Sequence, residues 1–85
     1  MEIILTESAK LDLEFFKKTN NQIILKKIRH LLESMLLNPS FGIGKPEKLK
    51  YDLAGKWSRR INTEHRLVYE IDENLIIVHS LKGHY

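Results

Sequence analysis

Hydrophobic residues recur at helical spacing through the first half of the chain. Ala9, Leu13 and Phe16 share one face of the segment 7–18, and their spacing of i, i+4 and i+7 is typical of an amphipathic helix. A wider stripe of Ile, Leu and Met runs through residues 24–36. A stripe of that width predicts a second helix that lies on a sheet.

Polar residues mark where these two helices begin and end. Thr6 or Ser8 is expected to cap the first helix, because a short polar side chain accepts a hydrogen bond from the free N–H groups of a first turn. Asn20 or Asn21 is expected to do the same for the second helix. Asn38–Pro39 is expected to end it, since the residue before a proline disfavours helical geometry. The short polar turn between the two segments predicts antiparallel helices.

The spacing of hydrophobic residues changes in the second half of the chain. Segments rich in β-branched and aromatic residues predict strands, and short polar connections predict hairpins between them. These segments are 57–62, 65–71 and 75–81, and residues 1–6 predict a further strand at the start. With the loop 39–46, the order is β-α-α-β-β-β. This order predicts an α+β fold in which two helices pack on one face of a mostly antiparallel sheet and leave the other face free.

Length and composition narrow the class of protein. A chain of 85 residues has room for one domain, residues 1–85. It contains no cysteine, which excludes a disulfide framework and a thiolate metal site. No hydrophobic run approaches the length of a membrane span, and no signal peptide is recognisable. We therefore expect a soluble, cytoplasmic protein with no membrane partner.

Positive charge is concentrated in one stretch of the chain. Residues 44–66 hold seven Lys and Arg against three Asp and Glu, a net charge of +4, whereas the rest of the chain has seven bases and eight acids. A folded patch of Lys and Arg attracts polyanions, most often phosphate backbones. The stretch also contains a Glu and a Trp, and the chain ends in His84–Tyr85. This mixture indicates chemistry on a nucleic acid rather than adhesion alone.

Cleavage of an RNA strand without a metal needs three chemical roles. A base removes the 2′-hydroxyl proton, an acid protonates the leaving 5′-oxygen, and cations stabilise the charge on the phosphorane. Glu47 and His84 are the candidates for proton transfer, and residue types alone do not decide which is the base. Arg66, Arg60 and Lys50 are the candidates for charge stabilisation, because the fork of an Arg side chain binds two phosphate oxygens at once. We expect no metal and no cofactor.

Taken one at a time, these residue types have simpler interpretations. Arg59 and Arg60 alternate across a strand, so they are expected to face opposite sides, with a solvated position as the default for either. Trp57 is interpreted as a core aromatic residue, and Tyr69 as a packing residue whose hydroxyl stays wet. His65, at the end of a hairpin, is interpreted as a turn residue, with phosphate binding as the alternative.

The order of the residues is more specific than their types. Residues 44–71, GKPEKLKYDLAGKWSRRINTEHRLVYEI, together with the terminal His–Tyr, closely resemble the Txe/YoeB family of bacterial toxins in the RelE-like superfamily. The blocks Gly44–Glu47, Trp57–Ile61 and Glu64–Tyr69 match with almost no gaps. The resemblance covers nearly the whole chain, and it implies the RelE-like, microbial-RNase-like fold.

The activity implied by this resemblance is that of an mRNA interferase. Such a toxin is a ribosome-dependent endoribonuclease that cuts the message in the A site and inhibits translation. The resemblance makes Glu47 the general base, Arg66 the group that stabilises the phosphate, and His84 the general acid. The products would be a 2′,3′-cyclic or 3′-phosphate end and a 5′-hydroxyl, with no metal needed. The residues implied to place the substrate are Lys50, Arg60 and Tyr85.

The resemblance also implies partners. Toxins of this family are held inactive by a cognate antitoxin, here expected to be YefM- or Axe-like, and a homodimer is expected for the free toxin. The resemblance also implies mRNA on the 70S ribosome as a partner. Two alternative functions stay open. One is a non-enzymatic toxin of the RelE/ParE fold, such as those that inhibit DNA gyrase, and the other is a basic nucleic-acid-binding module.

One departure from the family pattern lies near the end of the chain. Familiar members end in Arg-Tyr-His-Tyr, whereas this chain has Lys82–Gly83 before His84. Glycine is the most flexible residue in an unfolded or loop segment. Gly83 is therefore expected to loosen the tail that places His84.

Overall fold

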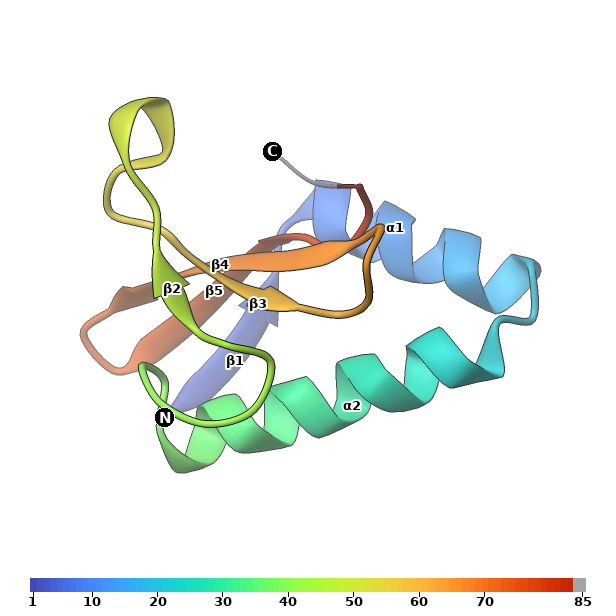
Figure 1. Ribbon diagram of the computed structural model, residues 1–85, viewed down its shortest axis with the longest axis horizontal. Helices are drawn as coiled ribbons and strands as arrows, with labels where there is room; N and C mark the ends of the chain where they lie inside the picture. The colour runs from blue at the N-terminus through green and yellow to red at the C-terminus, as the bar shows by residue number, and fades with distance from the viewer. Residues whose placement is uncertain (84–85) are drawn as a thin grey trace.

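The computed structural model describes residues 1–83, and its elements follow the predicted order with two additions (Figure 1). The helices are α1 (Glu7–Lys18) and α2 (Gln22–Leu37), and a 3₁₀ turn, η1, covers Tyr51–Leu53. The strands are β1 (Glu2–Leu5), β2 (Glu47–Lys48), β3 (Trp57–Arg60), β4 (Arg66–Asp72) and β5 (Leu75–Ser80). None of the described helices is long and apolar enough to cross a membrane.

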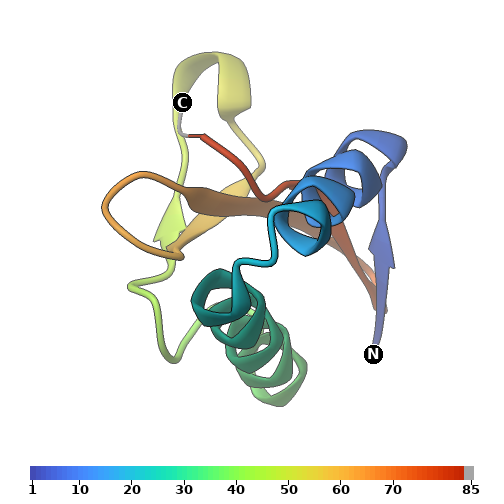
Figure 2. The same cartoon turned by 90° about the vertical axis from the view of Figure 1, so that its right-hand side faces the viewer.

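Side-chain caps set where both helices begin, as the sequence predicts. The Ala9 N–H donates to Thr6 Oγ1 at 3.2 Å, so Thr6 rather than Ser8 caps α1. The Ile24 N–H donates to Asn21 Oδ1, also at 3.2 Å, so Asn21 caps α2. These bonds satisfy N–H groups that the first turn of a helix leaves free. Figure 2 shows the two helices beside one another, joined by the short turn between them.

A five-stranded sheet has the order β1-β5-β4-β3-β2. Strand β1 pairs parallel with β5, and all other neighbours are antiparallel. This arrangement confirms the predicted α+β fold with a mostly antiparallel sheet. The additions are the two-residue strand β2 and η1, which together form an arm that projects from the edge of the sheet (Figure 1).

The hydrophobic core lies between the helices and one face of the sheet. Its fully buried members come from both helices and from strands β4 and β5, and they include Phe16, Leu31, Met35, Leu67 and Ile76. Burial of a side chain of this size stabilises the fold by about 1.5–3 kcal/mol relative to exposure. Trp57 packs against the same cluster, as its interpretation as a core aromatic residue predicts.

Arg59 is the one charged side chain among residues 1–83 that is fully buried, and the expectation of a solvated position is wrong for it. The side chain is fully buried on the helix side of the sheet. Its Nε donates to Tyr69 Oη at 3.1 Å, and Nη1 donates to Ser34 Oγ at 2.8 Å and to the Ile43 carbonyl at 3.1 Å. Nη2 donates to the carbonyls of Asn38 (2.8 Å) and Phe41 (3.1 Å). All five N–H groups of the guanidinium are therefore satisfied.

The hydroxyl of Tyr69 is dry, which corrects the prediction that it stays wet. Tyr69 is fully buried, and its hydroxyl donates to the Pro39 carbonyl at 2.6 Å while it accepts from Arg59. Burial raises the pKa of the Tyr69 phenol above its ordinary 10.0, and the Arg59 hydrogen bond and charge act in the opposite direction. Together Arg59 and Tyr69 fasten the loop 38–43 to the sheet.

Candidate functional site

The open face of the sheet carries the predicted charged residues in register. Cross-strand partners point to the same face, and the pairs are Glu47 with Ser58, Ser58 with Val68, and Arg60 with Arg66. Alternation along β3 and β4 places Ser58 with Arg60 and Arg66 with Val68. These five residues therefore share the face that lies opposite the buried Arg59.

Arg60 and Arg66 are direct partners across strands β3 and β4. Two like charges placed opposite one another destabilise a sheet, so a pair of this kind is suited to an anion that neutralises both. The Arg66 side chain is held at one point, where Nη1 donates to the Asn62 carbonyl at 3.2 Å. Arg60 is exposed.

Glu47 lies two strands away from Arg66, on the edge strand β2. Strand spacing and one two-residue step along the sheet put their Cα atoms roughly 12 Å apart. Glu and Arg side chains of ordinary length can therefore contact the same phosphodiester from its two sides. Glu47 and Lys50 both line a hollow of ≈ 490 Å³ beneath the arm, together with Tyr51. The fold thus gathers Glu47, Lys50, Arg60 and Arg66 on or beside one face.

Two turns set the positions of these strands. Gly44 has φ +81°, and a Cβ there would lie 2.6 Å from Leu31 Cδ2, so only glycine lets the loop pass between α2 and β3. The Arg60 N–H donates to the Gly44 carbonyl, which fastens the chain just before Glu47. In the hairpin before Arg66, Asn62 Oδ1 accepts from two successive backbone N–H groups, those of Glu64 (2.9 Å) and His65 (2.8 Å).

The chain that follows β5 returns to the start of β4. The Gly83 N–H donates to His65 Nδ1 at 2.8 Å, and the Gly83 carbonyl accepts from the Arg66 N–H at 2.9 Å. Gly83 has φ +76°, a conformation that other residues rarely adopt. The expectation that Gly83 loosens the tail is therefore wrong, because the glycine supplies a geometry in which it is held by two hydrogen bonds.

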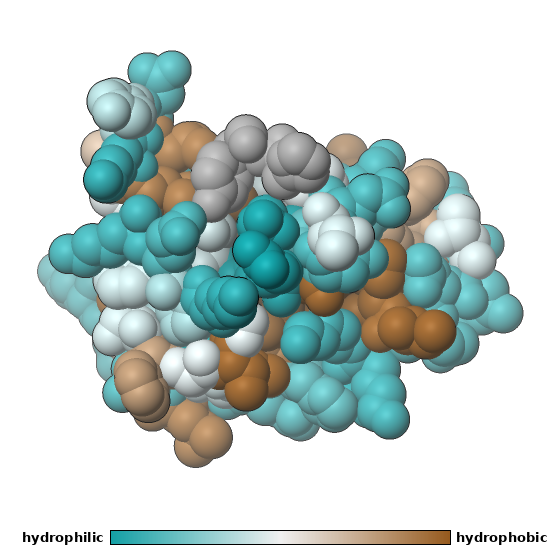
Figure 3. Space-filling view, in the orientation of Figure 1, coloured by the Kyte–Doolittle hydropathy of each residue, from teal (hydrophilic) through white to brown (hydrophobic). Residues whose placement is uncertain are grey.

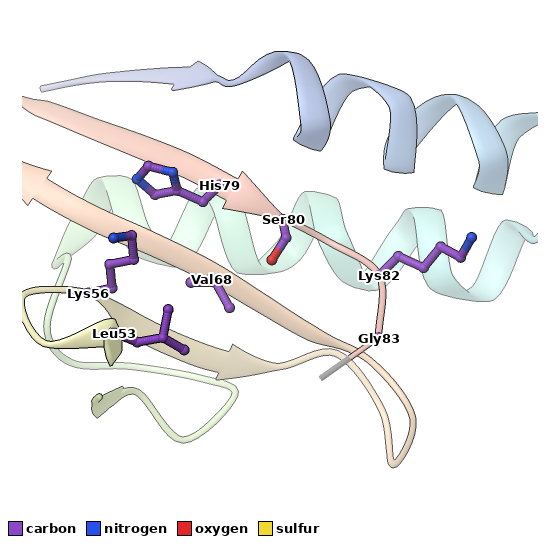
Figure 4. Close-up of a pocket in the computed structure, with 7 residues that line it drawn as sticks. All are labelled: Leu53, Lys56, Val68, His79, Ser80, Lys82 and Gly83. Carbon is purple, nitrogen blue, oxygen red and sulfur yellow. The ribbon is translucent and has the colours of Figure 1, made fainter. Parts of the chain in front are cut away.

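A second hollow, of ≈ 300 Å³, lies beside Gly83 (Figure 4). Leu53 and Lys56 line it from the arm side, and His79 and Ser80 line it from β5. Lys82 extends away from the hollow toward α1, where its Nζ lies 3.9 Å from the centre of the Phe15 ring. Its charge is therefore used in a cation–π contact and not at the open face.

Polar and hydrophobic side chains lie in separate regions of the surface. Figure 3 shows hydrophilic side chains across the face over β2, β3 and β4, whereas hydrophobic ones gather along its lower edge. The exposed large hydrophobic residues include Leu37 and Phe41. Because Arg59 is buried, the charge that residues 44–66 present to a ligand is smaller than the sequence suggests, +3 rather than +4.

Of the predicted site residues, Glu47, Lys50, Arg60 and Arg66 belong to the described part of the chain and lie on or beside the open face of the sheet, and their roles stay predictions. His84 and Tyr85 lie outside the described residues. Among the described residues, no group of three or more His, Asp or Glu could hold a metal ion. Sequence reasoning missed the contact of His65 with Gly83. The only sequence signal for this contact is that His65 directly precedes Arg66 in the chain.

Comparison with known proteins matches this arrangement to one family. Residues 5–85 match the model of the YoeB-like toxin of bacterial type II toxin–antitoxin systems. Toxin YoeB of Synechocystis sp. is 45% identical over 100% of this chain and 98% of its own length. Two solved structures from Staphylococcus aureus are also similar. A YoeB–YefM complex has a TM-score of 0.88 at 50% identity and covers 98% of this chain and 95% of that one. A YoeB dimer has a TM-score of 0.89 at 48% identity and covers 100% and 98%.

Proposed function

The chain belongs to the family of YoeB-like toxins of bacterial type II toxin–antitoxin systems, and we propose that it is an endoribonuclease that cleaves mRNA in the A site of the 70S ribosome. The observation that supports this most strongly is the Arg60–Arg66 pair, in cross-strand register on the face that also carries Glu47. The carboxylate is a candidate base and the two guanidinium groups are candidate cations for the phosphorane, which are two of the three roles that metal-free cleavage requires.

The reaction proposed for this face is transfer of the phosphodiester to the neighbouring 2′-oxygen. The 2′-oxygen attacks phosphorus as Glu47 removes its proton, and the bond from phosphorus to the 5′-oxygen breaks. His84 gives its proton to that leaving oxygen, so the products are a 2′,3′-cyclic phosphate and a 5′-hydroxyl. Arg66 binds the non-bridging oxygens, on which negative charge grows in the transition state.

Three residues are proposed to place the RNA strand rather than to react with it. Lys50 lies beside Glu47 at the arm, and Arg60 lies opposite Arg66, so both are positioned to contact phosphates that flank the cut. Tyr85 is proposed to stack on or orient the nucleotide at the cut, since aromatic rings stack on any base. The ribosome would present the strand in an extended form on this face.

Partners are proposed on the same basis. A YefM-like antitoxin is proposed to inhibit this chain, and self-association into a homodimer is proposed for the free toxin. The S. aureus relatives support both, since one was solved as a YoeB–YefM complex and the other as a YoeB dimer. An antitoxin segment with acidic side chains would complement the positive face.

The experiment that tests the function compares three substrates under one set of conditions. Purified toxin is mixed with mRNA threaded on 70S ribosomes, with the same mRNA free in solution, and with supercoiled DNA and gyrase. We expect cutting of the ribosome-bound message only, with 2′,3′-cyclic phosphate ends. His84→Ala should abolish it while circular dichroism stays unchanged.

Other outcomes would replace the proposal. Inhibition of gyrase without RNA cleavage would identify a non-enzymatic toxin. Tight binding of free RNA whose affinity falls steeply with salt, without cleavage, would identify a basic binding module, because counterion release would then supply the binding energy.

A further inference from the structure

The last described residues are fastened to the rest of the molecule at successive positions. The Leu81 N–H donates to Asp12 Oδ2 on α1 at 2.9 Å, and Lys82 lies over the Phe15 ring of the same helix. Gly83 is then bound by His65 and by the backbone of Arg66. The segment is thus held on two sides, by α1 and by the start of β4, immediately before His84 in the chain.

The His65 ring is itself fixed in place. It contacts Phe16 edge-on, with the ring centroids 5.2 Å apart at an interplanar angle of 71°. Its backbone N–H donates to Asn62 Oδ1, and its carbonyl accepts from the Ile61 N–H at 3.0 Å. The ring has little freedom to turn away from Gly83, because Phe16 contacts it and the hairpin holds the backbone of the same residue.

The contact with Gly83 also defines the chemical form of this ring. A backbone N–H can only donate, so Nδ1 of His65 must carry a free lone pair. The ring is therefore neutral with its proton on Nε2. A doubly protonated imidazole has no lone pair, so protonation of His65 would break this hydrogen bond.

We propose that His65 is a positioning residue, whose Nδ1 holds the Gly83 amide so that the chain delivers His84 to the phosphate bound by Arg66. This inference rests on the proposed cleavage reaction. One residue makes both contacts, since the Gly83 carbonyl accepts from the Arg66 N–H while the Gly83 N–H donates to His65. The residue that directly precedes the proposed acid in the chain is thus bound by His65 and by the backbone of the proposed phosphate-binding residue, Arg66.

Several charged groups belong to the segments that meet at this ring. Glu64 and Arg66 flank His65 in the chain, Asp12 comes from α1, and Lys82 comes from the tail. The residue of α1 that contacts the ring is the uncharged Phe16.

A matched pair of substitutions separates the hydrogen bond from the packing. His65→Phe keeps a ring against Phe16 but has no acceptor. His65→Asn loses the ring but places an amide oxygen the same number of bonds from the backbone as Nδ1, and it does not titrate. His30→Asn, which changes an exposed imidazole on α2, serves as the control. Each variant is purified as the full chain, and its unfolding free energy is measured.

Cleavage of ribosome-bound mRNA is the first measurement. Misplacement of a reacting group by about 1 Å lowers rates by as much as 100-fold, so we expect kcat to fall about 10- to 100-fold in His65→Phe, with KM unchanged. His65→Asn should recover most of this loss, because its amide oxygen can accept the hydrogen bond from the Gly83 N–H. A His65→Phe variant that cleaves at the wild-type rate would overturn the proposal.

Nuclear magnetic resonance of the Gly83 amide tests the anchoring without reference to activity. We expect a slowly exchanging amide in the wild type and in His65→Asn, a rapidly exchanging one in His65→Phe, and an Nδ1 nitrogen without a proton in the wild type. An amide that is identical in the wild type and in His65→Phe would overturn the proposal. If the wild type does not cut RNA, the proposed function fails. The exchange rate of the Gly83 amide then still tests whether His65 holds the tail.

Discussion

Arg59 and Arg60 are neighbours in the chain, yet the sheet places them in opposite environments. Arg59 is fully buried among backbone carbonyls on the helix side, whereas Arg60 is exposed on the open side next to Arg66. Arg59 makes all of its hydrogen bonds within the protein. Strand alternation places Arg60 on the side of the sheet on which Glu47 lies.

The difference shows that residue type does not decide what a cation does in this fold. A buried guanidinium is stable only when its N–H groups are all satisfied, and the loop 38–43 supplies most of the acceptors. An exposed pair of arginines gains little from the fold and becomes useful only when an anion arrives. The helix side thus maintains the structure, and the open side is the side proposed to react.

The largest expected effect is the loss of the buried cation. Arg59→Ala should lower the free energy of unfolding by about 3–5 kcal/mol, because three carbonyls and the Tyr69 hydroxyl lose their donor. Urea denaturation measures this value. Arg60→Ala is the matched control, expected within about 0.5 kcal/mol of the wild type although its cleavage is reduced. Equal stability of the two variants would contradict the division between the two faces.

Alkaline pH should lower the stability of the folded chain through Tyr69, which is buried on the helix side of the sheet. Because the pKa of Tyr69 is raised in the folded chain, that chain keeps the phenol proton to a higher pH than the unfolded chain does. Stability that is fully present below about pH 10 should therefore fall as the pH rises above 10. Denaturation at a series of pH values measures this fall, and tyrosinate absorbance should show one late-titrating tyrosine.

Tyr69→Phe is the variant that isolates this residue. It should remove the late tyrosine from the titration and cost about 1–3 kcal/mol at neutral pH, because the Arg59 Nε and the Pro39 carbonyl each lose a partner. A titration that is unchanged in this variant would mean that another tyrosine ionises late.

A smaller effect on stability than that of Arg59→Ala is expected at Gly83. A Cβ at Gly83 would meet no atom within 4 Å, so Gly83→Ala should cost only about 1–2 kcal/mol, from the positive φ. Gly55 is a matched control, since it has φ +93° and is equally uncrowded but lies in the arm. We expect similar destabilisation in both alanine variants, with slower cleavage in Gly83→Ala. Equal cleavage rates would show that the tail geometry at Gly83 does not matter.

The sequence predicted the parts of this fold that depend on local pattern. The helix caps and the last three strands follow from residues a few positions apart, and the opposite facing of Arg59 and Arg60 follows from strand alternation. The strand β2 was missed, because two residues at a sheet edge carry no periodic signal. The burial of Arg59 was also missed, because its acceptors lie 10–25 residues away in the chain.

The sequence also predicted some features of the candidate site and missed others. Family resemblance selected Glu47, Lys50, Arg60 and Arg66, and pairing of β2, β3 and β4 brings them to one region. The role of Gly83 was mispredicted, since a positive φ stabilised by a histidine 18 residues away is a tertiary property. The predictions for His84 and Tyr85 lie outside the described residues and stay predictions.

The most direct test of the open face as the reacting face is a single-turnover rate for Glu47→Gln on ribosome-bound mRNA. The substitution preserves size and removes the charge and basicity of a side chain that the strand register places on that face. We expect cleavage at least about 100-fold slower than the wild type, from the loss of general-base catalysis, with the unfolding free energy unchanged. A folded Glu47→Gln variant that cuts at the wild-type rate would contradict the account.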